Sequence, residues 1–242
     1  MFEQTRAIVL NNIKYSDNSS ITHFYTEKFG RLSVMIRHSK SKKSVSKKSI
    51  LQPLFLLNID IQHKENREVQ QCKEMINHPV FQNIPFNIVK SSIAIFLAEF
   101  LTKVLKEEEA NSSLFEFLHN SIQLFDQTNT GSANFHLVFL YDLSKFLGFY
   151  PENNYSPQNS YFNLRDGYYS RYKESNEISL GKELSMQLNF VCHFGFKSLD
   201  RIELSRNQRS KLLYALISYY KFHLPEVGKI KSLDVLNQVF ED

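Results

Sequence analysis

The 242-residue sequence contains no tryptophan, only two cysteines and only seven glycines. The glycines are so dispersed that the closest pairs, Gly167 with Gly181 and Gly181 with Gly195, lie fourteen residues apart. A loop that wraps the phosphates of a nucleotide needs glycines only a few residues apart. The sequence therefore excludes the glycine-rich nucleotide-binding loops, and it carries no motif of an ATPase or GTPase.

The two cysteines also argue against an oxidising compartment and against a metal site. Cys72 and Cys192 are far apart, and the polar start MFEQTR is unlike a secretion signal. The pair Cys192-His193 has no second thiolate pair and no HExxH motif beside it, so we expect it to pack in the core. No apolar run approaches the roughly 18 residues of a membrane span. We expect a cytoplasmic protein without membrane, metal or cofactor.

The sequence also lacks a convincing catalytic cluster. The acidic run Glu107-Glu108-Glu109 is followed by Asn111-Ser112-Ser113, which is typical of a solvated turn at the end of a helix. Metal-dependent nucleases need carboxylates that converge from separate elements, and nothing in the sequence indicates such convergence. We therefore predict that the protein is not an enzyme.

Aromatic residues and cations are what the chain has in excess. It contains 21 Phe and 12 Tyr and is 42% hydrophobic, so aromatic packing should dominate its interior, and the length favours two domains over one. The first 80 residues hold 13 Lys and Arg against 7 Asp and Glu, whereas the remainder holds 16 against 18. The basic surplus therefore belongs to the first third of the chain.

Much of that surplus lies in one segment, RHSKSKKSVSKK at 37–48, which contains six cations and no acid. It separates two alternating apolar segments, so it is predicted to be a loop within a β-domain. A polyanion is the natural partner of such a loop. A flexible solvated loop is the plain alternative, whereas a membrane surface is disfavoured because no amphipathic helix or lipidation signal accompanies the cations.

The apolar period changes near Pro79. Before it, short alternating segments predict five strands and hence a small closed barrel. These segments are 5–15, 19–27, 31–37, 54–62 and 68–76. In the third segment Leu32, Val34 and Ile36 should face the core, which places Arg31 and Arg37 on the outer face.

After Pro79 the apolar residues recur every three to four positions, which predicts helices. A bundle of three is expected at 88–105, 114–125 and 135–149, followed by helices at 180–194 and 205–222. Ser205 is a predicted cap, and the last helix should end before Pro225. Between the two blocks, 151–177 is an irregular insertion with one expected hairpin that turns at Asp166-Gly167. The predicted domains are 1–79 and 80–242.

The order of several segments resembles the bacterial RecO family of DNA repair and recombination mediators. TRAIVLNNIKYSDNSS is followed by YTEKFGRLSVMIR, the Lys/Ser loop and LQPLFLLNIDIQ. Later landmarks are LGFYPE, YFNLRDGYY and LLYALISYYKFHLPEVGKIKSLDVLNQVF, so the resemblance extends over essentially the full chain. Two departures are Ala7, where the family often has glycine, and the absence from the insertion of the four cysteines with which some members hold zinc.

The resemblance implies an α+β multidomain protein, in which a five-stranded OB-fold β-barrel is followed by an all-helical domain with an irregular insertion. It further implies binding of single- and double-stranded DNA, annealing of complementary strands, and assistance with RecR in loading RecA onto DNA coated with single-stranded DNA-binding protein (SSB). A nucleoid-associated protein of the cytoplasm, without a chemical step or a metal, is the expected result.

The expected site residues follow from the loop and from the resemblance. The predicted phosphate contacts are Lys14, Arg31, Arg37, Lys40, Lys42, Lys43, Lys47 and Lys48. Tyr15 and Tyr25, and less so Phe24 and Phe29, could stack on bases, although an aromatic side chain in a small barrel is more often in the core. The acidic SSB tail ends in an apolar residue, and Arg206, Arg209 and Lys211, next to Arg201, could form the basic rim of its pocket.

Two alternatives remain open. The barrel could bind RNA, because a Lys/Ser loop does not distinguish ribose from deoxyribose. The helical domain could instead be a protein-interaction scaffold, with the basic loop supplying only nonspecific attraction. Affinities for DNA and RNA strands of the same sequence, together with an annealing assay, would distinguish the first alternative from DNA binding. Neutralisation of the loop without loss of cellular activity would favour the second.

Overall fold

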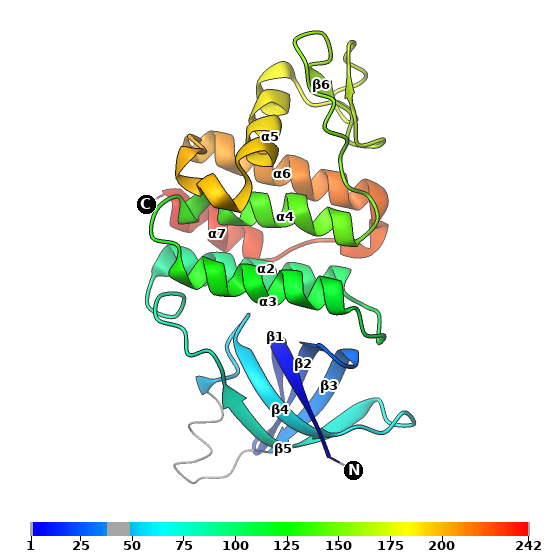
Figure 1. The fold of residues 1–242 in the computed structure, drawn as a ribbon, viewed down its shortest axis with the longest axis vertical. Helices are drawn as coiled ribbons and strands as arrows, with labels where there is room; N and C mark the ends of the chain where they lie inside the picture. The colour runs from blue at the N-terminus through cyan, green and yellow to red at the C-terminus, as the bar shows by residue number, and fades with distance from the viewer. Residues whose placement is uncertain (1, 38–48, 242) are drawn as a thin grey trace. The chain divides into compact units, whose positions relative to one another are not determined.

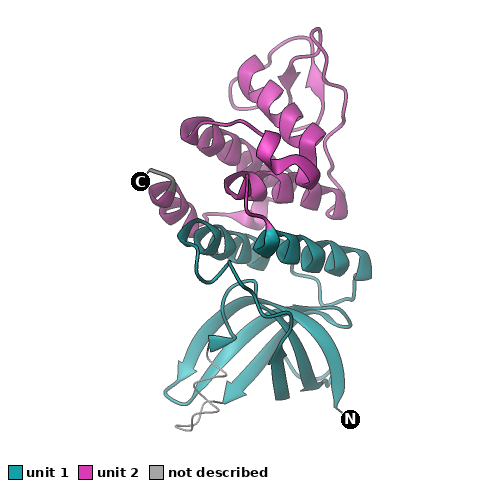
Figure 2. Ribbon diagram, turned by 60° about the vertical axis from the view of Figure 1, so that its left-hand side comes forward, with its two compact units in different colours: residues 1–127 teal, residues 128–242 magenta. Residues whose placement is uncertain are grey.

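The computed structural model describes residues 2–37 and 49–241 (Figure 1). Of the predicted phosphate contacts, Lys40, Lys42, Lys43, Lys47 and Lys48 lie outside the described residues. The chain forms two compact units, Met1–Gln127 and Thr128–Asp242, which Figure 2 distinguishes by colour. Each unit is described by itself below.

The first unit contains a closed five-stranded barrel, as the sequence predicts. The strands are β1 (Glu3–Ser16), β2 (Ser19–Thr26), β3 (Gly30–Arg37), β4 (Leu56–Gln62) and β5 (Val69–Asn77). Their order around the barrel is β1-β2-β3-β5-β4. All neighbours are antiparallel except β3 and β5, which pair in parallel over three residues of each strand. The predicted segments agree with these bounds to within two residues.

Side-chain alternation builds the barrel core. In β3, Leu32, Val34 and Ile36 are buried, whereas Ser33 and Met35 are only half-buried on the outer face. Strand β1 pairs with β4 over its first half and with β2 over its second half, so residues 11–16 extend beyond the β4 edge and are exposed. The second half of β1 and the start of β2 therefore form a protruding hairpin.

Helices α2 (Ile88–Val104) and α3 (Ser112–Gln127) belong to the same unit as the barrel. Arg6 on β1 donates to the Glu27 carboxylate at 2.9 and 2.7 Å and also to the Glu116 carboxylate on α3. Its guanidinium lies 5.1 Å from the ring centroid of Phe115, on which Tyr25 stacks at 6.3 Å. These contacts tie the barrel to α3, so the compact unit ends later than the change from strands to helices.

The second unit is mainly helical. Its elements are η1 (Ser132–Asn134), α4 (Phe135–Phe146), β6 (Tyr161–Phe162), β7 (Tyr169–Ser170), α5 (Lys182–Phe194), η2 (Gly195–Arg201), α6 (Arg206–His223), η3 (Pro225–Val227) and α7 (Ser232–Glu241). The three helices expected as one bundle are thus divided, because α4 lies in this unit. The predicted start of α6 is confirmed: Ser205 and Gln208 form a capping box.

The predicted hairpin at Asp166-Gly167 is present in the irregular segment between α4 and α5. Strands β6 and β7 are antiparallel, and Gly167 between them has a φ of 73°, a left-handed conformation that favours glycine. Phe162 packs against Tyr169 with ring centroids 4.9 Å apart. The hairpin is therefore held partly by aromatic packing, as its composition predicts.

Two asparagines supply the polar cross-links of this segment. The Asn154 amide accepts from the backbone N–H of Tyr169 at 2.8 Å and donates to its carbonyl at 2.9 Å, so it pairs with the chain as a strand would. Asn163, fully buried, accepts from the backbone N–H groups of Arg165 and Asp166 at 2.8 and 3.0 Å. Among the residues that the structure describes, no group of three or more His, Cys, Asp or Glu side chains could hold a metal ion.

The predicted core position of Cys192-His193 is only partly correct. Cys192 is half-buried, but His193 is exposed on α5, with its ring 5.3 Å from that of Phe194. The triplet Glu107-Glu108-Glu109 is exposed, as predicted, and lies in the irregular segment that follows α2. None of the helices in the described part of the chain is long and apolar enough to cross a membrane.

Candidate nucleic-acid interface and partner groove

The outer face of β1, β2 and β3 carries a row of partly exposed side chains. Ile13 pairs with Ile21, which pairs with Met35, so these three side chains lie side by side across the sheet. Ile13 is 50% exposed, and the other two are half-buried. The row is apolar, and its flexible Met side chain can adapt to the shape of a ligand.

The hairpin end of this face supplies a cation and an aromatic ring. Tyr15 is 67% exposed, so it is available for stacking as the sequence suggests. Lys14 contacts Asp17 at 2.9 Å, but both side chains are largely exposed. An ion pair in that position contributes little, so the Lys14 ammonium can exchange its partner for a phosphate.

Arg37 ends β3 and is exposed. It lines a groove of about 210 Å³ together with Met35, Cys72, Lys73 and Met75 from the facing edges of β3 and β5. The groove opens where the short parallel pairing of these strands has ended. Arg37 and Lys73 therefore place two cations on this groove, and Arg37 is also the first residue of the basic segment 37–48.

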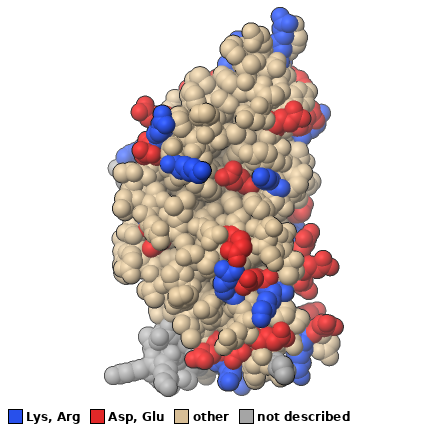
Figure 3. All heavy atoms as spheres, viewed as in Figure 1, with Lys and Arg blue, Asp and Glu red and all other residues tan. Residues whose placement is uncertain are grey.

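The loop between β4 and β5 lies at the opposite end of β3 and was not predicted as part of the site. Its His63 stacks on Phe29 at 4.3 Å, and a groove of about 440 Å³ is lined by His63, Arg67 and Ser33. The carboxylates of Glu65, Glu68 and Glu108 also line it. On the face shown in Figure 3, cations and acids of the described residues are likewise interspersed, so the described surface alone forms no continuous basic field there.

Two residues expected at the interface have other partners. Arg31 donates to the carbonyls of Thr102 and Leu105 at 3.0 Å each, which satisfies the C-terminal end of α2. Tyr25 is only 3% exposed and packs on Phe115, and burial raises the pKa of its hydroxyl to about 12. A base cannot reach Tyr25 in this fold, and we do not retain either residue as a contact.

The other two aromatic residues considered for stacking are also engaged. Phe24 is fully buried in the barrel, and Phe29 is covered by His63. Alternation in a strand predicts which face a side chain takes, but it does not predict whether a helix or a loop covers that face. Tyr15 alone among the four candidates is highly exposed.

The second unit contains a groove of about 640 Å³ between the irregular segment and the helices α5 and α6. Its apolar lining includes Leu164, Leu180, Leu184, Tyr214, Ala215 and Phe222. Lys211 and Lys221 also line it, one from the second and one from the last turns of α6, with one acid, Glu177. The groove can take an apolar side chain and place an attached anion against a lysine.

Of the basic rim that the sequence predicts, Arg206, Arg209 and Lys211, only Lys211 lines this groove. Lys211 lines it, but Arg209 does not, because its guanidinium donates to Asn134 Oδ1 at 2.9 Å and to the Leu204 carbonyl at 3.2 Å. Burial lowers the pKa of Arg209 from its ordinary value. Arg206 is exposed in the first turn of α6 and lies outside the lining of the groove. Lys221, which the sequence reading missed, takes their place on the same face of α6 as Lys211, ten residues further along the helix.

The class of protein follows from the barrel. Five strands closed in the order β1-β2-β3-β5-β4 form an OB-type barrel, here followed by helices. The family model described as recombination protein O N terminal matches residues 1–78, and that described as recombination protein O C terminal matches residues 85–234.

Similar proteins extend over the whole length. DNA repair protein RecO of Azobacteroides pseudotrichonymphae is 36% identical over 241 residues, covering 100% of both chains. The protein of the same name from Phocaeicola vulgatus is 33% identical over 240 residues, which is 99% of this chain and 100% of that one. That from Flavobacterium psychrophilum is 34% identical over 238 residues, 98% of each. The chain belongs to the RecO family.

Proposed function

We propose that this protein is a DNA repair and recombination mediator that acts by binding and not by a chemical step. It binds single- and double-stranded DNA on the barrel, anneals complementary strands, and assists RecR in loading RecA onto SSB-coated DNA. Membership of the RecO family and the OB-type barrel support this proposal. The observation that carries it is the partly exposed outer face of β2 and β3, which the exposed hairpin residues Lys14 and Tyr15 flank. In sequence, this face continues through Arg37 into the five lysines of the basic loop.

The basic loop gives the first test. If its six cations contact the phosphates of one strand, they contribute about −4 to the log–log salt slope, roughly 0.7 for each contact. Replacing Lys40, Lys42, Lys43, Lys47 and Lys48 with serine should remove most of that slope, with the melting temperature unchanged. A slope equal to that of the wild type would refute the assignment.

Single substitutions extend the test to the described surface. Lys14→Ser should lower the salt slope by about 0.7. Lys106→Ser, which removes another exposed cation of the same unit, is the matched control and should leave the slope unchanged. Equal effects of the two substitutions would indicate a diffuse charge effect and not a contact at the hairpin.

The RNA alternative is tested with the same titrations. The described face offers stacking and phosphate contacts but no feature that requires a 2′-hydroxyl group. We expect DNA strands to be annealed at least as fast as RNA strands of the same sequence. Clear preference for RNA in both binding and annealing would favour the alternative.

The groove of the second unit is the proposed site of the SSB tail. An acidic segment with a terminal apolar side chain matches its apolar lining and its two lysines. In fluorescence anisotropy with a labelled tail peptide, Lys211→Glu with Lys221→Glu should abolish binding. Arg206→Glu, on the same helix but outside the lining, is the control. Full displacement of the peptide by excess oligonucleotide would mean one shared site and would contradict the separation of the two functions.

A further inference from the structure

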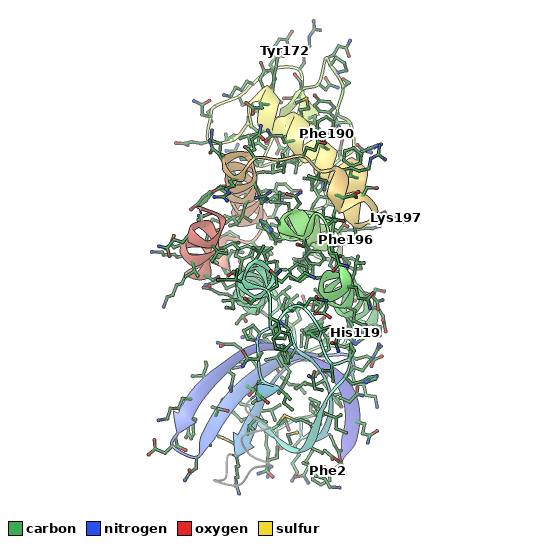
Figure 4. The ribbon with its side chains drawn as sticks, turned by 90° about the vertical axis from the view of Figure 1, so that its left-hand side faces the viewer. Phe2, His119, Tyr172, Phe190, Phe196 and Lys197 are labelled. Carbon is green, nitrogen blue, oxygen red and sulfur yellow. The ribbon has the colours of Figure 1, made fainter. Side chains whose placement is uncertain are left out.

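One flank of the second unit exposes aromatic rings next to cations and has no role in the function proposed above. The residues are Met186, Phe190 and Phe194 on α5, followed by Lys197 and Arg201 on η2. Within α5, Met186, Phe190 and Phe194 recur every four residues and therefore lie on one side of that helix. The helix ends at Gly195, and η2 joins the stripe because the Arg201 guanidinium lies 5.1 Å from the ring centroid of Phe194. In Figure 4 the labelled Phe190 and Lys197 lie along one flank of α5 and η2. We call these five residues the α5–η2 stripe.

The stripe is accessible although it is apolar. Phe190 is 42% exposed and Met186 is 38% exposed, whereas Lys197 and Arg201 are exposed beyond them. Large apolar side chains gathered on a surface are a common mark of a binding site. Phe196, also labelled in Figure 4, turns the other way and packs on Phe135 at 5.1 Å, which anchors η2 to α4. This packing fixes the η2 part of the stripe to α4.

The rings and the cations are already in contact with one another. Phe190 and Phe194 have ring centroids 6.2 Å apart, and the Arg201 guanidinium lies 5.1 Å from the Phe194 centroid. The exposed His193 ring meets Phe194 at 5.3 Å. A guanidinium stacked beside a ring presents a flat, charged extension of the aromatic surface. The result is a run of flat groups with positive charge at one end.

Flat rings interleaved with cations match single-stranded nucleic acid, whose bases stack on aromatic faces while its phosphates meet Lys and Arg. We propose that the α5–η2 stripe is a second site for single-stranded nucleic acid, distinct from the barrel. The exposed acids Asp200 and Glu203 lie next to it and limit its charge, so it should be the weaker site. With two phosphate contacts, its salt slope should be about −1.4.

This inference rests on the proposed annealing function and adds to it. Annealing brings two complementary strands together. A site in the second unit would allow one chain to bind one strand on each unit. The groove lined by Lys211 and Lys221 does not include any stripe residue, so a tail peptide and a second strand need not compete there.

Photo-crosslinking of the full-length protein tests the location directly. A single-stranded oligothymidine with 5-iodouracil substitutions is irradiated on the protein, and crosslinked peptides are mapped by mass spectrometry. We expect crosslinks within 186–201 as well as in the barrel, and those within 186–201 should persist in the loop variant. Crosslinks confined to the barrel would overturn the inference. Crosslinks confined to 186–201 would instead contradict the proposed barrel site and leave the stripe supported, whereas crosslinks elsewhere in the second unit would overturn the stripe.

A matched pair of variants links the site to annealing. Phe190→Ser with Lys197→Glu should lower the annealing rate at least about fivefold, the loss expected for one stacked base. Tyr172→Ser with Arg171→Glu is the control, because Tyr172 is 73% exposed in the same unit with the Arg171 guanidinium 5.6 Å from its ring. The single substitution Phe190→Tyr keeps an aromatic ring at this position, so it should leave the annealing rate at the wild-type value. Equal losses in the stripe and control variants, or an unchanged rate in the stripe variant, would refute the site.

Discussion

Asp126 at the end of α3 offers the sharpest test of how the first unit is held together. Its side chain is 6% exposed. The carboxylate accepts from the backbone N–H groups of Gln82 at 2.9 Å, Asn83 at 2.8 Å and Ile84 at 2.8 Å. Its backbone carbonyl also accepts from the Lys90 ammonium at 2.8 Å. One residue of α3 therefore fixes the segment that connects the barrel to α2.

The cost of Asp126→Asn can be worked out from these contacts. One carboxylate oxygen becomes an NH₂ group, which cannot accept, so at least one buried N–H group loses its partner and faces another donor. A hydrogen bond to a charged group contributes about 1.5–3 kcal/mol, and an unsatisfied buried donor costs about 1–3 kcal/mol. We expect the free energy of unfolding to fall by about 2–4 kcal/mol, and Asp126→Ala to cost more because all three N–H groups lose their acceptor.

Urea unfolding followed by far-UV circular dichroism measures the change, and hydrogen exchange of a peptide spanning 80–90 locates it. The two units need not unfold together, so the transition of the first unit must be identified by its exchange. Asp17→Asn is the matched control, since Asp17 is 94% exposed and pairs only with an exposed lysine. It should cost less than about 0.5 kcal/mol. If Asp126→Asn costs no more than this control, the account of the connection is wrong.

Three further predictions concern the second unit. Burial lowers the pKa of His136 to about 3, so as the pH falls this histidine is protonated in the unfolded chain before it is protonated in the folded protein. At pH 5 this difference lowers the free energy of unfolding by about 2 kcal/mol. In His136→Leu, the loss of stability between pH 7 and pH 5 should therefore be smaller. Burial raises the pKa of Asp142 to about 6, so ionisation of this carboxyl group destabilises the fold as the pH rises. Asp142→Asn should therefore raise the free energy of unfolding by about 1–2 kcal/mol at pH 8 and by little at pH 4. No gain at pH 8 would contradict this prediction. Gly131 has a φ of 71°, and an added Cβ would lie 2.4 Å from the carbonyl carbon of Leu199, so Gly131→Ala should cost about 3 kcal/mol or more in urea unfolding. Gly148→Ala, with a φ of 86° and open space around it, should cost only about 1–2 kcal/mol, and equal costs would mean that the contact is irrelevant.

Local pattern was enough to predict the five barrel strands and the helices α2 to α6, but it missed α7 and the short 3-10 helices η1, η2 and η3. Period-two alternation in 31–37 gave β3 and its buried face, and Ser205 with Pro225 marked the limits of α6. The turn at Asp166-Gly167 was equally readable, because its left-handed position favours glycine. These features depend only on residues close in sequence, so they can be predicted without knowledge of the rest of the fold.

The candidate site was predictable only in part. The charge of the basic loop is a property of composition, and the exposure of Tyr15 agrees with its place at a hairpin end. Lys73 and Lys221 were missed, because nothing near them in sequence distinguishes a groove-lining lysine from any other surface lysine. His193 was assigned to the core from its apolar neighbours, whereas the structure places it on the exposed side of α5.

The sequence by itself determined the barrel strands, the helices α2 to α6, the excess of cations in the first third and the family. Tertiary structure decided which of the chemically equivalent side chains are available. Arg31 and Arg209 look like surface cations in sequence, but each guanidinium is taken by carbonyl groups, of Thr102 and Leu105 for Arg31 and of Leu204 for Arg209. The physical reason is that the last carbonyls of a helix or a loop must find donors, and a long basic side chain from a distant part of the chain can supply them. Only folding brings those partners within reach.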